Sequence, residues 1–286
     1  MPDVAPPLVS VIVPTHDRPD LLASAMQSIL NQSIDAFEVI VIDDASSPPA
    51  AIPDDARFRL IRLDTRTGVA NARNCGLSAA NADLVCFLDD DDLMTPVRLQ
   101  IAVDHAADPV TVCAGGQIGL RTSSVRTLTG DVSDTILDTA TPYLGCVSVQ
   151  RSIAPPFDVR FDACEDVDWF LRLAASHRFV TTKRVGLLWR SHDDARPVLD
   201  AAARLAGSRR LLEIHSAYFA RHRRAGAYSW FRVATYAQQM RRPGAAMSAA
   251  VRSAMLQPTP SSLLRSWRVV TAALHRSSPT TGEASH

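Results

Sequence analysis

The stretch VCFLDDDDLM, residues 85–94, runs from a short apolar segment into four consecutive aspartates and back into apolar residues. Neighbouring carboxylates repel one another, so Asp89–Asp92 need a cation or polar ligands to offset their charge. The apolar residues before them predict a buried strand, which places the four acids just beyond a strand end.

Apolar and helical patterns alternate on both sides of this stretch. Strands are expected within residues 8–14, 37–46, 58–64, 83–92, 110–120 and 146–151, a strand or hairpin within 179–192, and helices within 18–33, 68–82, 95–107 and 162–177. Alternating strands and helices predict an α/β fold with a mostly parallel sheet and flanking helices. Ligands of such sheets bind beyond the carboxyl ends of the strands. We therefore expect Thr15, Asp17, Asp43 with Asp44, and Asp89–Asp92 to lie along one edge.

The composition is that of a soluble globular protein, with 286 residues of which 47% are hydrophobic and 21% charged. No apolar run reaches the ~20 residues that span a bilayer. The first residues also lack the pattern of a signal peptide, so we expect a cytosolic protein. The five cysteines occur singly, which predicts free, buried thiols rather than disulfides or zinc ligands.

The charge changes sign along the chain. Residues 1–199 hold 17 Lys and Arg against 27 acids, and residues 200–286 hold 13 Arg against three acids. From Val198 to Thr271 the pattern is helical, with breaks expected at Gly226, at Pro243-Gly244 and at residues 257–262. We therefore predict a catalytic domain over residues 1–197, a helical region over 198–275 that includes one helical hairpin, and a disordered tail over 276–286.

An arginine-rich helical region indicates an anionic partner. The natural candidate is an anionic membrane face that carries a lipid-linked acceptor. The alternative is an arginine-rich surface that only faces water. Nucleic acid is not expected, because the sequence contains no nucleic-acid recognition module.

Carboxylates at a strand end are typical ligands of hard divalent cations such as Mg²⁺ and Mn²⁺. The alternative is a solvated acidic loop that caps the helix near Thr95. The second acidic pair, Asp43-Asp44, also ends a predicted parallel strand, which favours a nucleotide and metal site over the acidic loop.

Four segments in order resemble the family 2 glycosyltransferases of the GT-A fold: residues 9–33, 37–46, 67–96 and 161–173. The resemblance covers about residues 8–195. It implies transfer of a sugar from a nucleoside diphosphate donor, most often a UDP-sugar, with inversion at the anomeric carbon and with a divalent metal. The expected setting is synthesis of a glycan, cell envelope or glycolipid.

The resemblance also implies roles for residues in the first half of the chain. Pro14 and Thr15 would hold the nucleobase, and Asp44 would bind uracil or ribose. Arg73 and Asn74 match a segment close to the donor.

The four aspartates cover the family's D-x-D motif. Asp91 would be the metal ligand, while Asp89 or Asp90 would reach the ribose or the donor sugar, with the register open by one residue. His192 stands where family members often carry a histidine, so it would bind the metal or the diphosphate. A lone histidine in a structural role is the alternative.

The segment CEDVDW, residues 164–169, matches the family's E-D motif. Asp166 would then be the general base that takes the proton from the acceptor hydroxyl, with Glu165 beside it. The alternative is that Glu165, Asp166 and Asp168 are acids favoured by the dipole at a helix N-terminus.

Two other functions compete with this reading. A phosphotransferase of the haloacid dehalogenase type would need its D-x-D motif after the first strand and a lysine at the site, and Lys183 is the sole lysine. A binding or scaffold protein with a degenerate transferase domain is the second, and turnover of a nucleotide sugar would distinguish it.

Overall fold

The computed structural model describes residues 6–119, 123–124, 127–137, 141–190 and 198–275. The chain divides into two compact units, one of residues 1–160 with 165–193 and one of residues 161–164 with 194–286. Each unit is described by itself below. His192 lies outside the described residues.

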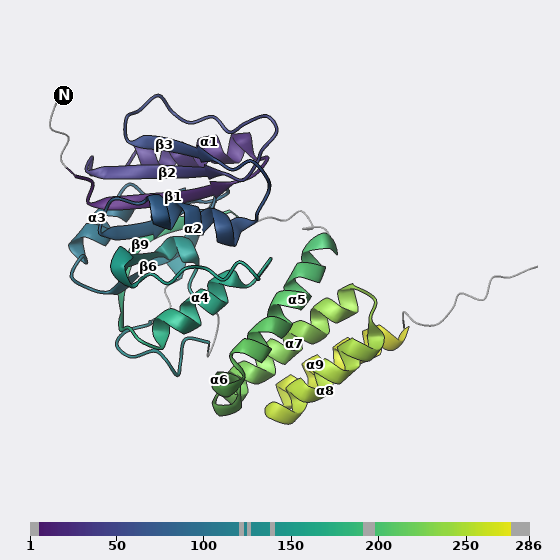
Figure 1. Cartoon of the computed structure of the whole chain (residues 1–286). Helices are drawn as coiled ribbons and strands as arrows, with labels where there is room; N and C mark the ends of the chain where they lie inside the picture. The colour runs from purple at the N-terminus through teal and green to yellow at the C-terminus, as the bar shows by residue number, and fades with distance from the viewer. Residues whose placement is uncertain (1–5, 120–122, 125–126, 138–140, 191–197, 276–286) are drawn as a thin grey trace, which may run out of the picture. The chain divides into compact units, whose positions relative to one another are not determined.

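The first unit is built on a nine-stranded sheet, counted over the described residues (Figure 1). The strands are β1 (Val9–Thr15), β2 (Phe37–Asp43), β3 (Phe58–Arg62), β4 (Leu84–Phe87), β5 (Leu93–Met94), β6 (Val110–Gln117), β7 (Ser123–Ser124), β8 (Val147–Gln150) and β9 (Phe179–Trp189). Their order is β3-β2-β1-β4-β8-β6-β9-β5, with β7 paired to β6. Strands β3, β2, β1 and β4 are parallel, and β6 is parallel to β9. β8 runs antiparallel to both β4 and β6, so β6 and β9 point the same way as β4.

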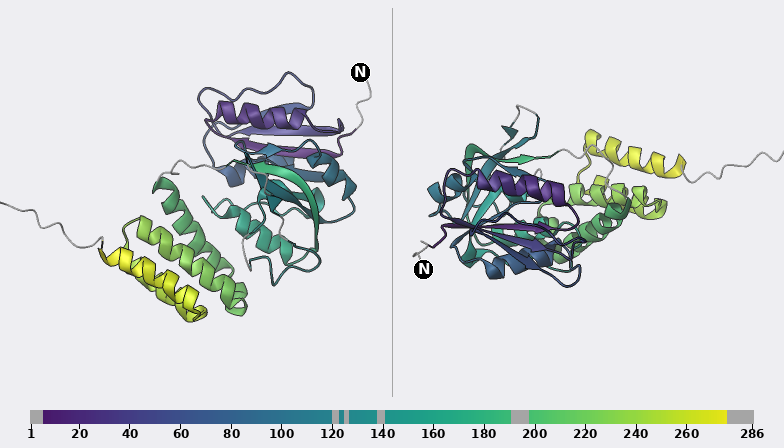
Figure 2. Two further views of the ribbon diagram at one scale, coloured as in Figure 1. Left: turned by 180° about the vertical axis from the view of Figure 1, so that it is seen from behind. Right: turned by 90° about the horizontal axis from the view of Figure 1, so that it is seen from above.

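Helices cover both faces of this sheet. They are α1 (Pro19–Leu30), α2 (Val69–Ala79), α3 (Arg98–Asp104) and α4 (Glu165–Ala174). Views from opposite sides show α1 on one face and α2 on the other (Figures 1 and 2). The expected α/β class with a mostly parallel sheet is confirmed.

The central strands are buried on both sides, which explains their continuous apolar sequences. Every residue of β1 is buried, and β2 is buried except for Glu38. In the register, Thr15 pairs with Asp43 and Ile12 pairs with Phe87. The polar residues that follow β1, β2 and β4 therefore lie at one edge of the sheet, as expected.

Three local features refine the expectations. Of the strand or hairpin expected over residues 179–192, the described residues form a single strand that ends at Trp189. The aspartates are followed by a two-residue strand, β5, which pairs with β9 and is too short to leave an alternating pattern in the sequence. The third concerns Gly226, where a helix break was expected and the helix instead continues.

The second unit is helical. Its helices are α5 (Val198–Ile214), α6 (Ser216–Arg221), α7 (Arg223–Gln239), α8 (Pro243–Leu256) and α9 (Pro260–His275). The core is rich in small residues, which lets the helices approach closely, and consists of Leu205, Val233, Ala234, Ala237, Ala246, Ala249, Ala250 and Val269. The expected break at Gly226 is wrong, because Gly226 lies inside α7. A Cβ built there would be 3.3 Å from both Leu256 Cδ1 and Phe219 O, so glycine serves close packing at this position.

No helix in the described part of the chain combines the length and the apolar character needed to cross a bilayer. All five cysteines fall in the described residues, and none of them forms a disulfide. Four of them are buried and Cys75 is half-buried.

Candidate active site

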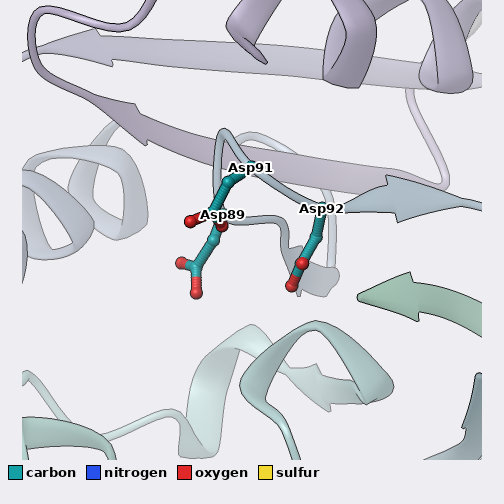
Figure 3. A group of neighbouring side chains, drawn as sticks. All are labelled: Asp89, Asp91 and Asp92. Atoms are coloured by element: carbon teal, nitrogen blue, oxygen red, sulfur yellow. The ribbon is translucent and has the colours of Figure 1, made fainter. Parts of the chain in front are cut away.

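The acidic loop between β4 and β5 brings three carboxylates together (Figure 3). Asp89, Asp91 and Asp92 each offer one oxygen, and these oxygens lie within 4.8 Å of one another. Figure 3 shows the carboxylates of Asp89 and Asp92 directed to the same side of the loop. Asp91 was expected as a metal ligand, but Asp92 was not singled out, because four identical residues in a row do not reveal which of them point the same way.

The fourth aspartate, Asp90, has a different environment. Its buried carboxylate accepts hydrogen bonds from Thr15 Oγ1 at 2.8 Å and from Arg18 Nη1 at 3.0 Å. Burial raises the pKa of Asp90, although these hydrogen bonds oppose the rise. Two residues expected at the donor, Thr15 and Asp90, are therefore bonded to each other, and they fix the acidic loop to the end of β1.

Arg18 is a site residue that the sequence analysis missed. Besides Asp90, its Nη1 atom lies 3.2 Å from Asp91 Oδ2, so one guanidinium faces two of the four acids. The available signal was its position between the end of the first strand and the proline that starts the first helix.

A second arginine, Arg73 on α2, joins the acidic loop to α4. Arg73 Nη2 donates to Asp89 Oδ1 and Nη1 donates to Glu165 Oε1, both at 2.7 Å. The guanidinium is buried, and its Nε atom has no hydrogen-bond partner among the described residues. Burial disfavours its charge, but Asp89 and Glu165 raise the pKa of Arg73. A cation and polar ligands were expected to offset the charge of the four aspartates, and in the structure Arg18 and Arg73 pair with three of them.

The neighbouring Asn74 supports the protein backbone. Its amide exchanges two hydrogen bonds with the main chain of Phe157, one from Nδ2 to the carbonyl at 2.8 Å and one from the Phe157 amide at 2.7 Å. Asn74 was expected close to the donor, and in this structure its side chain fixes the segment that precedes α4.

Asp92 faces a less favourable environment than its neighbours. It accepts one hydrogen bond from the backbone amide of Arg190 at 3.1 Å. Burial and the charge of Asp89 raise the pKa of Asp92 to about 7. A carboxylate held in this way gains from a nearby cation, because the cation stabilises the ionised form.

The expected base, Asp166, lies in the first turn of α4. Its Oδ1 atom accepts the Val167 amide at 2.8 Å, and the side chain is half-buried. Burial raises the pKa of Asp166 to about 6, with the charge of Glu165 adding to the rise and Arg73 opposing it. The third acid of this turn, Asp168, is bonded to Arg172 one turn later. Glu165, Asp166 and Asp168 thus have different hydrogen-bond partners. A shared attraction to the helix dipole does not account for these specific contacts.

The acids after β2 shape the loop that leads into α2. Asp44 accepts the backbone amides of Thr67 at 2.7 Å and Gly68 at 2.8 Å, and it is buried. Asp43 is also buried; burial favours a higher pKa, but hydrogen bonds from Ser46, Ala50 and Arg62 hold the pKa below its ordinary value.

Pro14 is buried within β1, beside Thr15 and opposite Ile42. The structure therefore gathers Asp89, Asp91, Asp92, Arg73, Glu165 and Asp166 at the end of β4, and it places Pro14, Thr15 and Asp44 at the ends of the adjoining strands.

Comparison with known proteins agrees with this arrangement. Residues 10–132, which include β1, β2 and the acidic loop, match the family model described as glycosyl transferase family 2. This stretch of the chain is therefore similar to the glycosyltransferases of family 2.

Two curated relatives illustrate the family match. The succinoglycan biosynthesis protein ExoO of Rhizobium meliloti is 36% identical over 129 residues, which cover 43% of this chain and 35% of ExoO. The UDP-Glc:alpha-D-GlcNAc-diphosphoundecaprenol beta-1,3-glucosyltransferase WfgD of Escherichia coli is 30% identical over 100 residues, which cover 34% of this chain and 40% of WfgD. The matched part of the chain thus spans less than half the length of these relatives.

Solved structures share the fold at low identity. S. aureus TarS 1–349 in complex with UDP-GlcNAc has a TM-score of 0.58 at 15% identity, with 96% of this chain and 93% of that chain covered. The mannosyltransferase PcManGT from Pyrobaculum calidifontis, in complex with GDP-Man and Mn²⁺, has a TM-score of 0.55 at 21% identity, with coverage of 96% and 89%. The GT-A fold implied by the family 2 resemblance is thereby supported.

The divalent cation that the family implies fits the residues found here. Three carboxylates supply the hard oxygen ligands that Mg²⁺ and Mn²⁺ prefer, and they converge from one short loop. His192, the other expected ligand, is not described by the structure.

Proposed function

We propose that this protein is a metal-dependent, inverting glycosyltransferase. It moves a sugar from a nucleoside diphosphate sugar, with UDP as the carrier, to a hydroxyl of a glycan or lipid-linked acceptor. The alternative, a degenerate domain that binds nucleotide sugars without turnover, is tested by the same experiments.

One observation carries the proposal: Arg73 binds Asp89 of the acidic loop and Glu165, the neighbour of Asp166. Asp89 and Glu165, one from each half of the site, are 76 positions apart in the sequence. A buried arginine that touches both gives the metal-binding candidates and the candidate base a fixed separation. A fixed geometry of this kind is what a displacement reaction between two bound substrates requires.

The acidic loop supports metal dependence. Asp89, Asp91 and Asp92 would hold the cation, which supplies positive charge that favours departure of the nucleoside diphosphate. Arg18, paired with Asp90, and Arg73, paired with Glu165, then balance the remaining carboxylates and keep the loop in place before the donor arrives.

Asp166 supports base catalysis. A carboxylate with a pKa of about 6 is mostly ionised at neutral pH, yet it is a stronger base than an ordinary aspartate. Its oxygen would accept the proton of the acceptor hydroxyl as that oxygen attacks the anomeric carbon. Attack from the face opposite the leaving group inverts the configuration at that carbon.

The ends of β1 and β2 support nucleotide binding. Pro14, Thr15 and Asp44 lie at the sheet edge beside the acidic loop, where α/β sheets bind their ligands. UDP is preferred as carrier because the names of WfgD and of the TarS complex include UDP-linked sugars. PcManGT was solved with GDP-Man, so GDP-sugars are the main competitor.

A panel of nucleotide sugars tests the proposal. UDP-, GDP- and dTDP-sugars are compared by thermal shift and calorimetry with and without Mn²⁺, and hydrolysis of each is then followed. We expect Mn²⁺-dependent binding and slow hydrolysis of a UDP-sugar. Binding without any turnover, in the presence of candidate acceptors, would favour the degenerate binding protein.

We further propose that the helical unit contacts an anionic membrane surface. On α8, Met247, Val251 and Met255 are spaced four residues apart and are 45%, 50% and 70% exposed. On α9, Leu263, Leu264 and Trp267 are also exposed. Exposed apolar side chains on helices rich in arginine and poor in acids are typical of interfacial contact.

Sedimentation with vesicles tests this contact. The full chain should bind vesicles that contain phosphatidylglycerol and should bind neutral phosphatidylcholine vesicles weakly, because each arginine near an anionic surface contributes about 1 kcal/mol. Binding should weaken as salt rises. Trp267→Ser should reduce it, and Tyr228→Ala, on α7, serves as a control. Equal binding of both vesicle types would contradict the proposal.

A further inference from the structure

Two aromatic rings form an exposed stack at the sheet edge. The rings of Tyr143 and Trp189 lie 4.7 Å apart between centroids and are inclined by 20°. Trp189 is half-buried, whereas Tyr143 is 53% exposed. Tyr143 is thus the outer ring of the pair, with much of its surface open to solvent.

The inner ring of the stack is seated on a glycine. A Cβ built on Gly115 would lie 2.8 Å from Trp189 Cζ3 and 3.0 Å from Cys146 Sγ. Any larger residue at position 115 would therefore push the indole outward. Trp189 also ends β9 in register with Gln117 of β6, and its carbonyl accepts the Ile118 amide at 2.9 Å. The sheet fixes the indole, and the indole supports Tyr143.

The stack lies close to the acidic loop. Arg190, which follows Trp189, donates its backbone amide to Asp92, and its side chain donates to the carbonyl of Asp91 at 3.3 Å. The charge of Asp92 also acts on the Tyr143 hydroxyl, whose pKa is raised by burial and by that charge. The rings and the three carboxylates therefore line one region of the sheet edge.

The order of the strands separates this region from the nucleotide side. The residues proposed to hold the nucleotide follow β1 and β2, and the carboxylates follow β4. The stack consists of Trp189, at the end of β9, and Tyr143, in the segment that leads into β8. β6 and β9 point the same way as β4, so all these groups lie at the same edge. Along the strand order the stack therefore lies beyond β4, on the side away from β1 and β2.

We propose that the open face of Tyr143 is the platform on which the sugar ring of the acceptor stacks. A hexopyranose presents a face of C–H groups that matches a flat aromatic surface, while its hydroxyls remain available to polar groups such as the tyrosine hydroxyl. Assignment of that ring to the acceptor rests on the proposed transferase function. The proposal that Tyr143 binds a sugar ring does not depend on that function.

Binding of simple glycosides tests the platform directly. The full chain, loaded with diamagnetic Mg²⁺ and UDP, is titrated with methyl glycosides of glucose, galactose, mannose and N-acetylglucosamine, and binding is followed by saturation-transfer NMR. The variants are Tyr143→Ala, which removes the outer ring, and Tyr143→Phe, which keeps it. Tyr228→Ala is the matched control, because Tyr228 is 47% exposed on α7.

We expect at least one glycoside to bind, with saturation transferred mainly to the C–H protons of one face. Tyr143→Ala should weaken its Kd at least tenfold, Tyr143→Phe should weaken it less than threefold, and Tyr228→Ala should leave it unchanged. UDP affinity should be the same in all four proteins.

Three results would overturn the platform: no glycoside binds, Tyr143→Ala binds as the parent does, or Tyr143→Ala weakens UDP. The last result would assign the ring to the nucleobase. Failure of the transferase function looks different, since glycosides would still bind while no nucleotide sugar is turned over.

Discussion

Arg73 Nη1 donates a 2.7 Å hydrogen bond to Glu165 Oε1 across 92 positions of sequence. Both side chains are buried. The bond joins α2 to the start of α4, and the other terminal nitrogen of Arg73 extends it to Asp89. The same guanidinium therefore stabilises the fold and spaces the two acidic parts of the site.

Replacing Arg73 by Met should lower the free energy of unfolding by about 3–5 kcal/mol, because Glu165 would remain buried without its cation. Urea unfolding followed by circular dichroism measures this change. Arg59→Met is the control, since the Arg59 side chain is 48% exposed in its pair with Glu38, and it should cost far less. The double variant Arg73→Met with Glu165→Gln should recover part of the loss. An unchanged stability in the single variant would show that the pair contributes nothing.

Asp91→Asn should weaken Mn²⁺-dependent binding of UDP at least tenfold, because it removes one charged ligand from the three that converge. Calorimetry with and without Mn²⁺ measures the effect. Asp92→Asn should behave in the same way, whereas Asp54→Asn, an exposed acid in a different loop, should not. If both loop variants bind UDP and Mn²⁺ as the parent does, the cation is held elsewhere.

The strands were predictable because burial on both sides leaves a continuous apolar sequence. Residues 8–14 and 37–46 were expected as strands, and β1 and β2 occupy Val9–Thr15 and Phe37–Asp43. Alternating strands and helices predict a parallel sheet, in which the carboxyl ends of the strands share one edge. Thr15, Asp44 and the four aspartates were therefore expected at that edge. This part of the site follows from local pattern and general topology.

The charge compensation was not predictable, because it depends on contacts between residues far apart in the chain. Arg18 meets Asp90 across 72 positions, and its position before the first helix does not reveal that partner. Arg98 is a similar case: it is fully buried and donates to the carbonyls of Gly145 and Val147, although an arginine in a helix is usually exposed. Tertiary packing alone decides where such residues point.

Transfer should depend on pH through Asp166. A base must be ionised to accept a proton, so turnover should fall about tenfold per unit as pH drops below about 6. Asp166→Asn should lower kcat by about 10²–10⁴ and leave donor binding intact, because the amide keeps the shape but cannot accept the proton. A pH profile of the parent and calorimetry of the variant check both parts. Parent-like turnover in Asp166→Asn would remove this residue from the mechanism.

The same variant should be more stable than the parent at neutral pH. The pKa of Asp166 is raised in the folded state, so the folded protein binds more protons than the unfolded chain between about pH 4 and pH 6. Stability of the parent therefore falls as pH rises through that window, and the asparagine variant lacks this fall. Thermal melting at pH 8 and pH 4, in chelator to exclude metal, should show a gain at pH 8 that is lost at pH 4. A gain of equal size at both values would point to packing rather than charge.

Among the described glycines of the helical unit, Gly207 should be the least replaceable. Alanine normally stabilises a helix by about 1 kcal/mol relative to glycine. At Gly207, however, the new Cβ would lie only 2.1 Å from the carbonyl oxygen of Ala163, and a backbone atom cannot rotate away. Gly207→Ala should therefore lower the melting temperature by several degrees, because α5 must separate from residues 161–164. Gly244→Ala is the matched control: it lies in the first turn of α8 with nothing within 4 Å of the new atom, so it should be neutral or slightly stabilising. If the two variants have the same melting temperature, α5 does not pack on residues 161–164 in solution.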